Sequence, residues 1–392
     1  MTRLFHTLVC IGGITSLSLT FFHPAMWAPV GMFLGFALLL VTPVILAEKP
    51  AEPPGFFLAL IWIGTTALLA LAYGFTEELF NVKQVALMLA GLLFGYFMSL
   101  TRAPPWVAWA PFGLFALYFT ILLVLGREPG DAFSRNSQNY VSVILLALYV
   151  SAIIMTRPSA VRIMHVLIAG FVLILSVWAA GRGGILASLL LVGGLFVRFI
   201  SQGRPGIIHG TIAAFMILAA SVALFFAGGI LESQGYLYKF EGRGLHDASR
   251  LSIIISYFDG IEISELLLGK NYYDDSFMAR WNFNLHNSYL DAWAHLTLYY
   301  LMFIVAVLVI TARRLRRHPV IVIAVLAFAA RAVTDSQMFS GQYDYVIFAT
   351  LFVLLREPGR EPVMARPAPS PSRAPRRYVG SPRQSASDEP GT

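Results

Sequence analysis

The sequence predicts an all-α, polytopic integral membrane protein with about twelve transmembrane helices and one large extracytoplasmic loop. Of its 392 residues, 57% are hydrophobic and 12% are charged, whereas soluble domains carry about 25% charged residues. The hydrophobic residues fall in blocks of about 18 or more, long enough to cross the hydrocarbon core of a bilayer. These blocks lack the polar–apolar alternation of membrane β-strands, so the prediction is helical.

The apolar blocks divide the chain into four regions. Residues 1–231 hold the first nine predicted helices, 232–286 form the loop with amphipathic helices, 287–356 hold the last three helices, and 357–392 form a tail. The tail mixes proline, serine and arginine without an apolar period, which is typical of a disordered segment. The predicted helices are 4–22, 25–47, 55–73, 83–101, 106–126, 138–156, 162–180, 183–200, 207–231, 287–311, 319–335 and 343–356.

The two ends of this series need separate arguments. The first block begins after Arg3, as a signal peptide would, but no small-x-small cleavage site follows, so it is predicted to be a retained helix. The last two blocks are short, and Arg331, Asp335 and Asp344 interrupt or flank them. They are the weakest of the twelve helical patterns.

Lysine and arginine set the predicted orientation. With the N-terminus inside and the helices alternating, eleven basic residues lie on the cytoplasmic side and five in short segments opposite. Cytoplasmic loops of membrane proteins are enriched in these residues, and the cluster from Arg313 to Arg317 contributes most. The sequence therefore predicts cytoplasmic N- and C-termini, with residues 232–286 on the outside.

Composition also excludes several kinds of site. Cys10 is the one cysteine, so an internal disulfide and cysteine-based zinc or iron–sulfur sites are not expected. Asp274 and Asp275 are adjacent carboxylates, but solvation is a plainer explanation for them than a metal site. The net charge of +7 lies largely in the tail and in loops assigned to the cytoplasm. No metal, cofactor or nucleic-acid partner is predicted.

His286 is the first candidate for chemistry. It closes the long polar loop and directly precedes an apolar helix, so it is predicted to lie at the membrane surface. An imidazole has an ordinary pKa near 6.5 and accepts a proton at physiological pH. The plainer alternative is that this segment only caps the helix, because Asn287 and Ser288 are good N-cap residues.

Two arginines are candidates for anion binding. Gly181-Arg182-Gly183-Gly184 lies between two apolar blocks on the outer side, and an arginine fork with free backbone N–H groups suits a diphosphate. A tight turn with a snorkelling arginine is the alternative. Arg250 precedes a helical pattern with apolar residues at 251, 254, 255 and 258, and a segment along the membrane surface would place Arg250 on its polar edge. A solvated loop charge is equally compatible.

Other polar and aromatic residues are weaker candidates. Arg135 and Asn139 belong to a polar cluster before the sixth helix, where they could bind sugar hydroxyls or merely cap the helix. The loop is rich in tyrosine, phenylalanine and tryptophan, which stack on sugars but also form interfacial belts.

Three ionisable residues, His165, His295 and Arg331, fall within apolar blocks and are functional candidates on that ground. His295 follows His286 by nine residues, about 2.5 helical turns. It therefore faces roughly the opposite way, so a joint site of His286 and His295 is not expected.

Together these features resemble the O-antigen ligase and O-antigen polymerase superfamily of bacterial membrane glycosyltransferases. The chain has the late outer loop, and Gly181–Gly184 resembles the family's small-Arg-Gly-small stretch. Arg250 precedes an apolar stretch ending in Leu267-Leu268-Gly269, and His286-Asn287-Ser288-Tyr289-Leu290 resembles its His-Asn-x-aromatic-Leu element. The resemblance covers residues 1–356. A second glycine two residues after Gly269 and a glycine pair after the His-Asn element, both frequent in the family, are missing.

The resemblance implies metal-independent glycosyl transfer from an undecaprenyl-diphosphate-linked glycan to an acceptor hydroxyl during surface polysaccharide assembly. His286 would be the catalytic base, and Arg182 and Arg250 would bind the diphosphate. Additional substrate-binding candidates are Arg135, Asn139, Asn287 and Tyr289. No cofactor is implied. The partners would be the lipid-linked glycan, membrane lipid and other polysaccharide assembly and chain-length proteins, at the periplasmic face of the bacterial inner membrane.

Polymerase and ligase differ only in the acceptor. The loop holds eight Asp or Glu residues against five Lys or Arg, which does not favour a phosphate-rich lipid A core, so an exopolysaccharide or O-antigen polymerase is slightly preferred. The competing functions are a transporter or flippase for lipid-linked oligosaccharide, and a membrane-bound acyltransferase. The second would need a histidine deeper in an apolar block, as His295 is.

Overall fold

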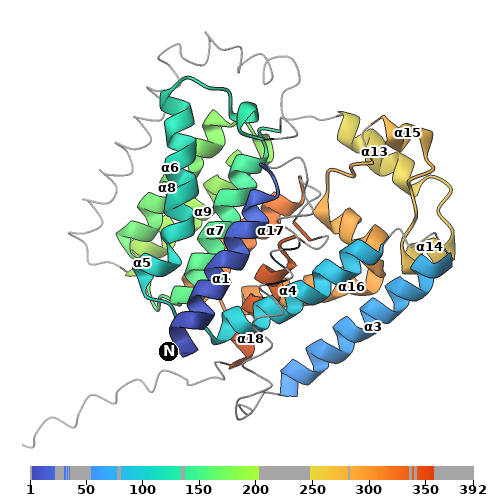
Figure 1. Ribbon diagram of the computed structural model, residues 1–392, viewed down its shortest axis with the longest axis horizontal. Coiled ribbons are helices and arrows are strands. Elements are labelled where there is room, and N and C mark those ends of the chain that lie inside the picture. Colours follow the sequence, from blue (N-terminus) through green and yellow to red (C-terminus); the bar gives the residue numbers. More distant parts are fainter. Residues whose placement is uncertain are drawn as a thin grey trace, which may run out of the picture. The chain divides into compact units, whose positions relative to one another are not determined.

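The computed structural model describes residues 2–22, 31, 33, 35, 54–76, 81–133, 137–202, 248–280, 283–334, 338, 339 and 342–356. Regular structure within them is helical (Figure 1). The elements are α1 (Thr2–Leu19), α3 (Pro54–Thr76), α4 (Val82–Leu100), α5 (Pro105–Ala108), α6 (Ala110–Val124), η1 (Pro129–Ala132), α7 (Tyr140–Thr156), α8 (Ile163–Trp178), α9 (Arg182–Gln202), α13 (Ala248–Phe258), α14 (Ile263–Leu268), α15 (Ser276–Ala279), α16 (Ser288–Arg313), α17 (Pro319–Ala332) and α18 (Asp344–Arg356).

Most predicted helices coincide with these elements to within a few residues. The helix predicted at 207–231 and the tail at 357–392 lie outside the described residues. So does the helix predicted at 25–47, except for residues 31, 33 and 35, which are helical.

Four of the described helices are long and apolar enough to cross a membrane: α3, α4, α9 and α16. Shorter apolar helices, among them α7, α8 and α17, accompany them. Long apolar helices of this kind indicate a membrane-embedded helical protein.

The single helix predicted at 106–126 is wrong, because two helices occupy that range. α5 ends at Ala108, and α6 begins at Ala110 with Pro111 in its first turn. Proline lacks an N–H group, and its ring clashes with the carbonyl four residues earlier, so a helix restarts at proline more easily than it passes through it.

The interior of the described bundle is formed by α7, α17 and α18. Nearly every residue of α7 and α18 is buried. α18 lies against α4, and α17 lies against α7 and α9. The α4–α18 contact is close because Gly95 has no side chain, and a Cβ there would lie 2.7 Å from the Cβ of Phe348. Small residues allow helix backbones to approach in this way in membranes.

α16 is broken at Thr297, whose φ of 75° and ψ of 159° are not helical. Two hydrogen bonds join α16 to other helices close to this break. Trp62 of α3 donates its indole N–H to the carbonyl of Tyr299 at 3.0 Å, and Trp293 donates its own to the carbonyl of Leu266 in α14 at 2.9 Å. Gly269, which follows α14, lies against the carbonyls of Trp293 and Ala294. The break therefore has specific packing partners on both sides.

The described part of the predicted loop forms a small core of its own. α13, α14 and α15 precede α16, and Ile253, Tyr257, Tyr272, Met278 and Leu285 pack with Trp293. The predicted helix at Arg250 is confirmed as α13, although the Arg250 side chain lies outside the described atoms. Residues 251, 255 and 258 of its predicted apolar face are exposed, and a second face at 253 and 257 is buried.

Candidate functional site

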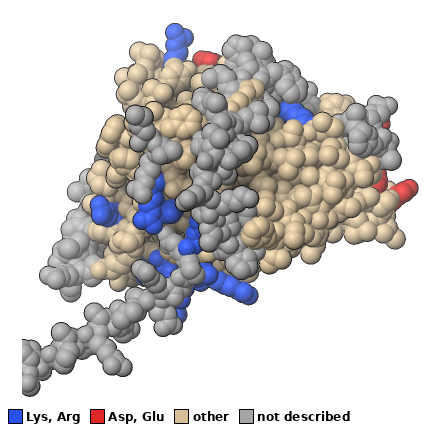
Figure 2. All heavy atoms as spheres, turned by 60° about the horizontal axis from the view of Figure 1, so that its bottom comes forward, with Lys and Arg blue, Asp and Glu red and all other residues tan. Residues whose placement is uncertain are grey.

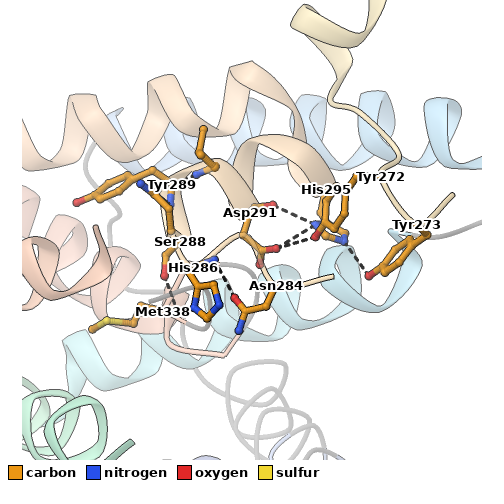
Figure 3. Close-up of polar contacts among 11 residues, drawn as sticks. Tyr272, Tyr273, Asn284, His286, Ser288, Tyr289, Asp291, His295 and Met338 are labelled. Carbon is orange, nitrogen blue, oxygen red and sulfur yellow. Dashed lines mark hydrogen bonds and ion pairs between the residues drawn. The ribbon is translucent and has the colours of Figure 1, made fainter. Parts of the chain in front are cut away.

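His286 lies immediately before α16, in a backbone conformation that its sequence position did not reveal. Its φ is 51°, in the left-handed region that histidine adopts more readily than most residues. The side-chain oxygen of Asn284 accepts the His286 backbone N–H at 2.8 Å and supports this turn. The residue is half-buried. Figure 3 shows its imidazole in front of the first turn of α16.

The two residues after His286 start the helix, as predicted. Asn287 is the N-cap, and its side-chain oxygen accepts the N–H groups of Tyr289 and Leu290 at 2.9 and 3.2 Å. The Ser288 hydroxyl accepts the backbone N–H of Met338 at 3.0 Å, which ties the segment between α17 and α18 to this turn. Asn287 thus has the capping role that the plainer interpretation gave it, and this cap determines where His286 stands.

Arg331 is the buried cation of this end of the bundle. It is 1% exposed, near the C-terminus of α17. Its guanidinium donates to the Ser142 hydroxyl at 3.1 Å, the Thr334 hydroxyl at 2.8 Å and the Asn139 carbonyl at 3.2 Å. These bonds explain why a short apolar helix contains a charged side chain. Arg331 holds the start of α7 against the end of α17.

Arg182 is the first residue of α9. Its glycine neighbours pack against Arg331 and the residues that accept its hydrogen bonds, Ser142, Thr334 and Asn139, which together are called the Arg331 group. A Cβ at Gly183 would overlap Thr334, and a Cβ at Gly184 would overlap Ser142 and lie 3.8 Å from Arg331 Nε. A Cβ at Gly181 would lie 3.0 Å from the side-chain oxygen of Asn139. The glycines are therefore needed for close packing, and they bring half-buried Arg182 to the same end of the bundle as Arg331.

Tyr289 links this group to the His286 turn. Its hydroxyl donates to the carbonyl of Ala329, two residues before Arg331 in α17, at 2.9 Å. We use "polar end" for the N-termini of α7, α9 and α16 together with the C-terminus of α17. The structure thus places Arg182, Asn139, Asn287, Tyr289 and His286 at the polar end. Arg135 lies outside the described residues.

Asp275 and two of the loop aromatics have structural roles that the sequence analysis did not predict. Asp275 is the N-cap of α15 and accepts the Phe277 N–H at 2.7 Å, and no cluster of three metal-ligating side chains occurs among the described residues. Tyr257 and Tyr272 are buried in the loop core, so their rings serve packing. Tyr273 differs, with 40% of its surface exposed.

A second polar group extends along the first turns of α16. The Asp291 carboxylate accepts the Tyr272 hydroxyl at 3.1 Å and lies 3.6 Å from His295 Nδ1. His295 Nε2 is 3.4 Å from the hydroxyl of Tyr273. Figure 3 shows this series of contacts. A carboxylate and an imidazole four residues apart were visible in the sequence, but only the fold brings the two tyrosines to them.

The electrostatics of the group affect the tyrosines. Burial raises the pKa of Tyr272 well above its ordinary value, and the neighbouring Asp291 charge raises it further. Burial and the same charge also raise the pKa of Tyr273. Both hydroxyls therefore stay protonated at neutral pH and can donate hydrogen bonds to Asp291 and His295.

The prediction that His286 and His295 face opposite ways rested on a wrong premise. α16 begins at Ser288, and His286 has a left-handed φ, so helical phase does not apply to it. In the view of Figure 3, the Asp291 carboxylate lies between the two imidazoles.

The opposite end of the helices carries other basic residues. Arg313, Arg314, Arg316 and Arg317 at the C-terminal end of α16 line, with Ile310, a cavity of about 470 Å³. Arg157, at the C-terminus of α7, and Arg356, at the end of α18, donate to Ser99 at the end of α4. Figure 2 shows basic side chains gathered on one part of the surface, with acidic ones at its edges. Basic side chains thus concentrate at the end opposite the polar end, although Arg182 and Arg331 lie at the polar end itself.

Replacing Gly183 with alanine tests the packing at the polar end. We expect Gly183→Ala to lower the free energy of unfolding by about 2–4 kcal/mol, because Thr334 must move and its bond to Arg331 is strained. Gly193→Ala, on the same helix with open space around it, should be neutral or stabilising by up to about 1 kcal/mol. Denaturant unfolding of both purified variants in detergent measures the difference, and equal stability would contradict the close packing.

Comparisons of this chain with models of known protein families, with curated proteins and with solved structures gave no match.

Proposed function

We propose that the chain is a metal-independent glycosyltransferase that moves a glycan from undecaprenyl diphosphate to an acceptor hydroxyl. One observation carries the proposal: a half-buried histidine is held at a helix N-terminus, at the same end of the bundle as Arg182 and the Arg331 group. A neutral-pH base beside cations suits a reaction that removes a proton and releases a diphosphate.

The proposed reaction assigns a role to each group. His286 accepts the proton of the acceptor hydroxyl as its oxygen attacks the anomeric carbon. Arg182 and the N-terminus of α9 bind the departing diphosphate, since both attract anions. Arg250, in α13, would add a second cation. Arg331 is a positioning residue, because its guanidinium donates to Ser142, Thr334 and Asn139 around the glycines of α9.

The proposed orientation follows from the basic cluster at the C-terminal end of α16. The end of α16 that carries Arg313–Arg317 suits the cytoplasmic side of a bacterial inner membrane, where basic residues concentrate. The polar end would then face the periplasm, and both termini the cytoplasm. Partners would include the lipid-linked glycan and other polysaccharide assembly and chain-length proteins. A polymerase remains slightly preferred to a ligase, on the acidic balance of the 232–286 loop.

Arg182→Ala in the producing strain tests the function. A strain lacking the gene is complemented with wild type, Arg182→Ala or the matched control Arg198→Ala, which changes the other end of α9. With equal membrane expression, we expect only Arg182→Ala to lose polysaccharide. Accumulation of single lipid-linked repeats would identify a polymerase. Polymer that stays on undecaprenyl and is missing from lipid A would identify a ligase.

Unchanged glycans in Arg182→Ala, with the protein present in the membrane, would overturn the proposal. Lipid-linked glycan accumulating on the cytoplasmic face would instead support a flippase. Loss of function in His295→Ala alone, with His286→Ala active, would favour an acyltransferase, because that chemistry needs the deeper histidine.

A further inference from the structure

Four arginines at the C-terminal end of α16 have no role in the transfer proposed above. Arg313 is the last residue of the helix, and Arg314 is its C-cap. Arg316 and Arg317 follow in the connection to α17. Together with Ile310, the four line a cavity of about 470 Å³, which we call the arginine cavity. Binding sites for small ligands have volumes of about 300–1,000 Å³, so this cavity is large enough for a lipid headgroup.

The connection that carries these side chains is held by its own backbone hydrogen bonds. The N–H groups of Arg317 and His318 both donate to the carbonyl of Arg314, at 3.0 and 2.9 Å. The Leu315 N–H donates to the carbonyl of Ala312 at 3.1 Å. The chain therefore makes tight turns here, and the four guanidinium groups stay within one short segment. Side chains that are already held close together lose less conformational freedom when a ligand binds.

The positive charge of the arginine cavity is not balanced by the described carboxylates. Arg313, Arg316 and Arg317 are exposed, and Arg314 is half-buried. Within the described part of the chain, none of the four forms an ion pair, and no acidic side chain lines the cavity. Like charges in one place repel one another, so a bound anion would stabilise them. Guanidinium groups bind phosphate through two parallel N–H donors, which makes phosphate the anion that fits best.

An apolar stripe leads from the cavity along the side of α16. Met302, Val305 and Val309 are exposed, and residues spaced by three or four lie on one face of a helix. Arg313 is four residues beyond Val309 and continues that face. At 1.5 Å per residue, Met302 lies about 16 Å along the helix from Arg313, which is about half of a hydrocarbon layer of roughly 30 Å. The stripe thus has the length of one leaflet, with the cavity at its end.

We propose that the arginine cavity binds the headgroup phosphate of an anionic phospholipid, whose acyl chains lie along Met302, Val305 and Val309. The stripe favours a lipid over a free phosphate, and the four positive charges favour an anionic headgroup over a zwitterionic one. Clusters of about four to eight basic residues beside a membrane helix bind anionic lipids in this way. The site lies at the opposite end of α16 from His286 and takes a membrane lipid, so it does not depend on the proposed function.

Lipid binding to the full chain tests the site. Purified, delipidated protein is titrated in detergent with anionic phosphatidylglycerol or zwitterionic phosphatidylcholine, and bound lipid is counted by native mass spectrometry. Wild type should prefer phosphatidylglycerol at least about tenfold. We expect Arg316→Gln/Arg317→Gln to weaken its binding by about 10–30-fold, since each basic residue beside an anionic lipid contributes about fivefold. Arg102→Gln/Arg198→Gln, the matched control, removes two charges near the C-terminal ends of α4 and α9, outside the cavity, and should bind as wild type.

A lysine variant separates this site from a general effect of charge. Helix-end stabilisation and membrane orientation need only positive charges, which remain when all four arginines are replaced by lysine. Lysine lacks the planar fork of arginine, so we expect weaker phosphatidylglycerol binding in this variant, with unchanged orientation. Binding equal to wild type in the lysine or the glutamine variant would overturn the arginine cavity as a site. Inorganic phosphate that displaces phosphatidylglycerol at comparable concentration would overturn its assignment to a lipid.

Photocrosslinking of the full chain in lipid nanodiscs locates the acyl chains. Phosphatidylglycerol with a diazirine in the middle of one chain should label α16 between residues 302 and 309, and should label it less in Arg316→Gln/Arg317→Gln. The matched surface is α6, because Leu114, Leu117 and Ile121 are also exposed but belong to a helix that does not line the cavity. Equal labelling of the two helices would overturn the proposed place of the acyl chains.

Discussion

His286→Gln is expected to lower the rate of glycosyl transfer by about 10²–10⁴-fold, the usual contribution of a general base. Glutamine keeps a polar side chain of similar length, so the turn before α16 and its bond to Asn284 remain possible. It cannot take up a proton at neutral pH. Because the loss concerns the chemical step, it should appear in single-turnover rates of the purified protein as well as at steady state.

His318→Gln is the matched control for this substitution. His318 is also half-buried and also directly precedes a helix, α17, but it lies at that helix's opposite end from Arg331. Its variant should transfer glycan at the wild-type rate. A His286→Gln protein that binds the lipid-linked glycan and transfers it within about twofold of wild type would remove His286 as the base.

Gly269→Ala is expected to have the largest effect on stability, about 3–5 kcal/mol from strain and overlap together. Gly269 has a φ of 99°, a conformation that is essentially confined to glycine. A Cβ there would overlap the carbonyl oxygen of Ala294 and lie 2.8 Å from that of Trp293. These are backbone atoms next to the break in α16, so they cannot rotate away as a side chain could.

Gly260→Ala separates strain from overlap. Gly260 also has a positive φ, of 64°, but has open space around its Cβ position, so its alanine variant should lose only about 1–2 kcal/mol. Unfolding of both variants in the same detergent gives the comparison. Similar losses for the two would mean that the turn after α14 does not press on α16.

The helices could be predicted because their signals are local. Apolar block length, the prolines before α5 and in α6, and the Asn287 cap all act within a few residues. Where the prediction failed, at 106–126, the signal was present: Pro111 marks the restart. The spacing of apolar residues predicts one apolar face for α13, but the helix has a second, because Ile253 and Tyr257 are buried in the loop core.

The break at Thr297 could not be predicted in this way. Kinks usually occur at proline or glycine, and neither occupies 297. Hydrogen bonds to distant segments lie close to the break: Trp62 of α3 donates to the carbonyl of Tyr299, and Trp293 donates to the carbonyl of Leu266 in α14. Similarly, the glycines around Arg182 suggested anion binding, while their close packing against Thr334 and Ser142 depends on how α7, α9 and α17 meet. Such contacts are tertiary, and a single sequence does not reveal them.

The shortness of α17 and of the part of α16 after its break has a consequence for the surrounding lipid. At 1.5 Å per residue, α17 and the part of α16 beyond Thr297 are about 20–24 Å long, less than the roughly 30 Å of a bilayer's hydrocarbon layer. Hydrophobic mismatch of this kind draws headgroups inward and thins the bilayer locally. Membrane thickness, set by acyl-chain length, therefore becomes a physical variable that determines how deep Arg331 and His286 lie below the lipid surface.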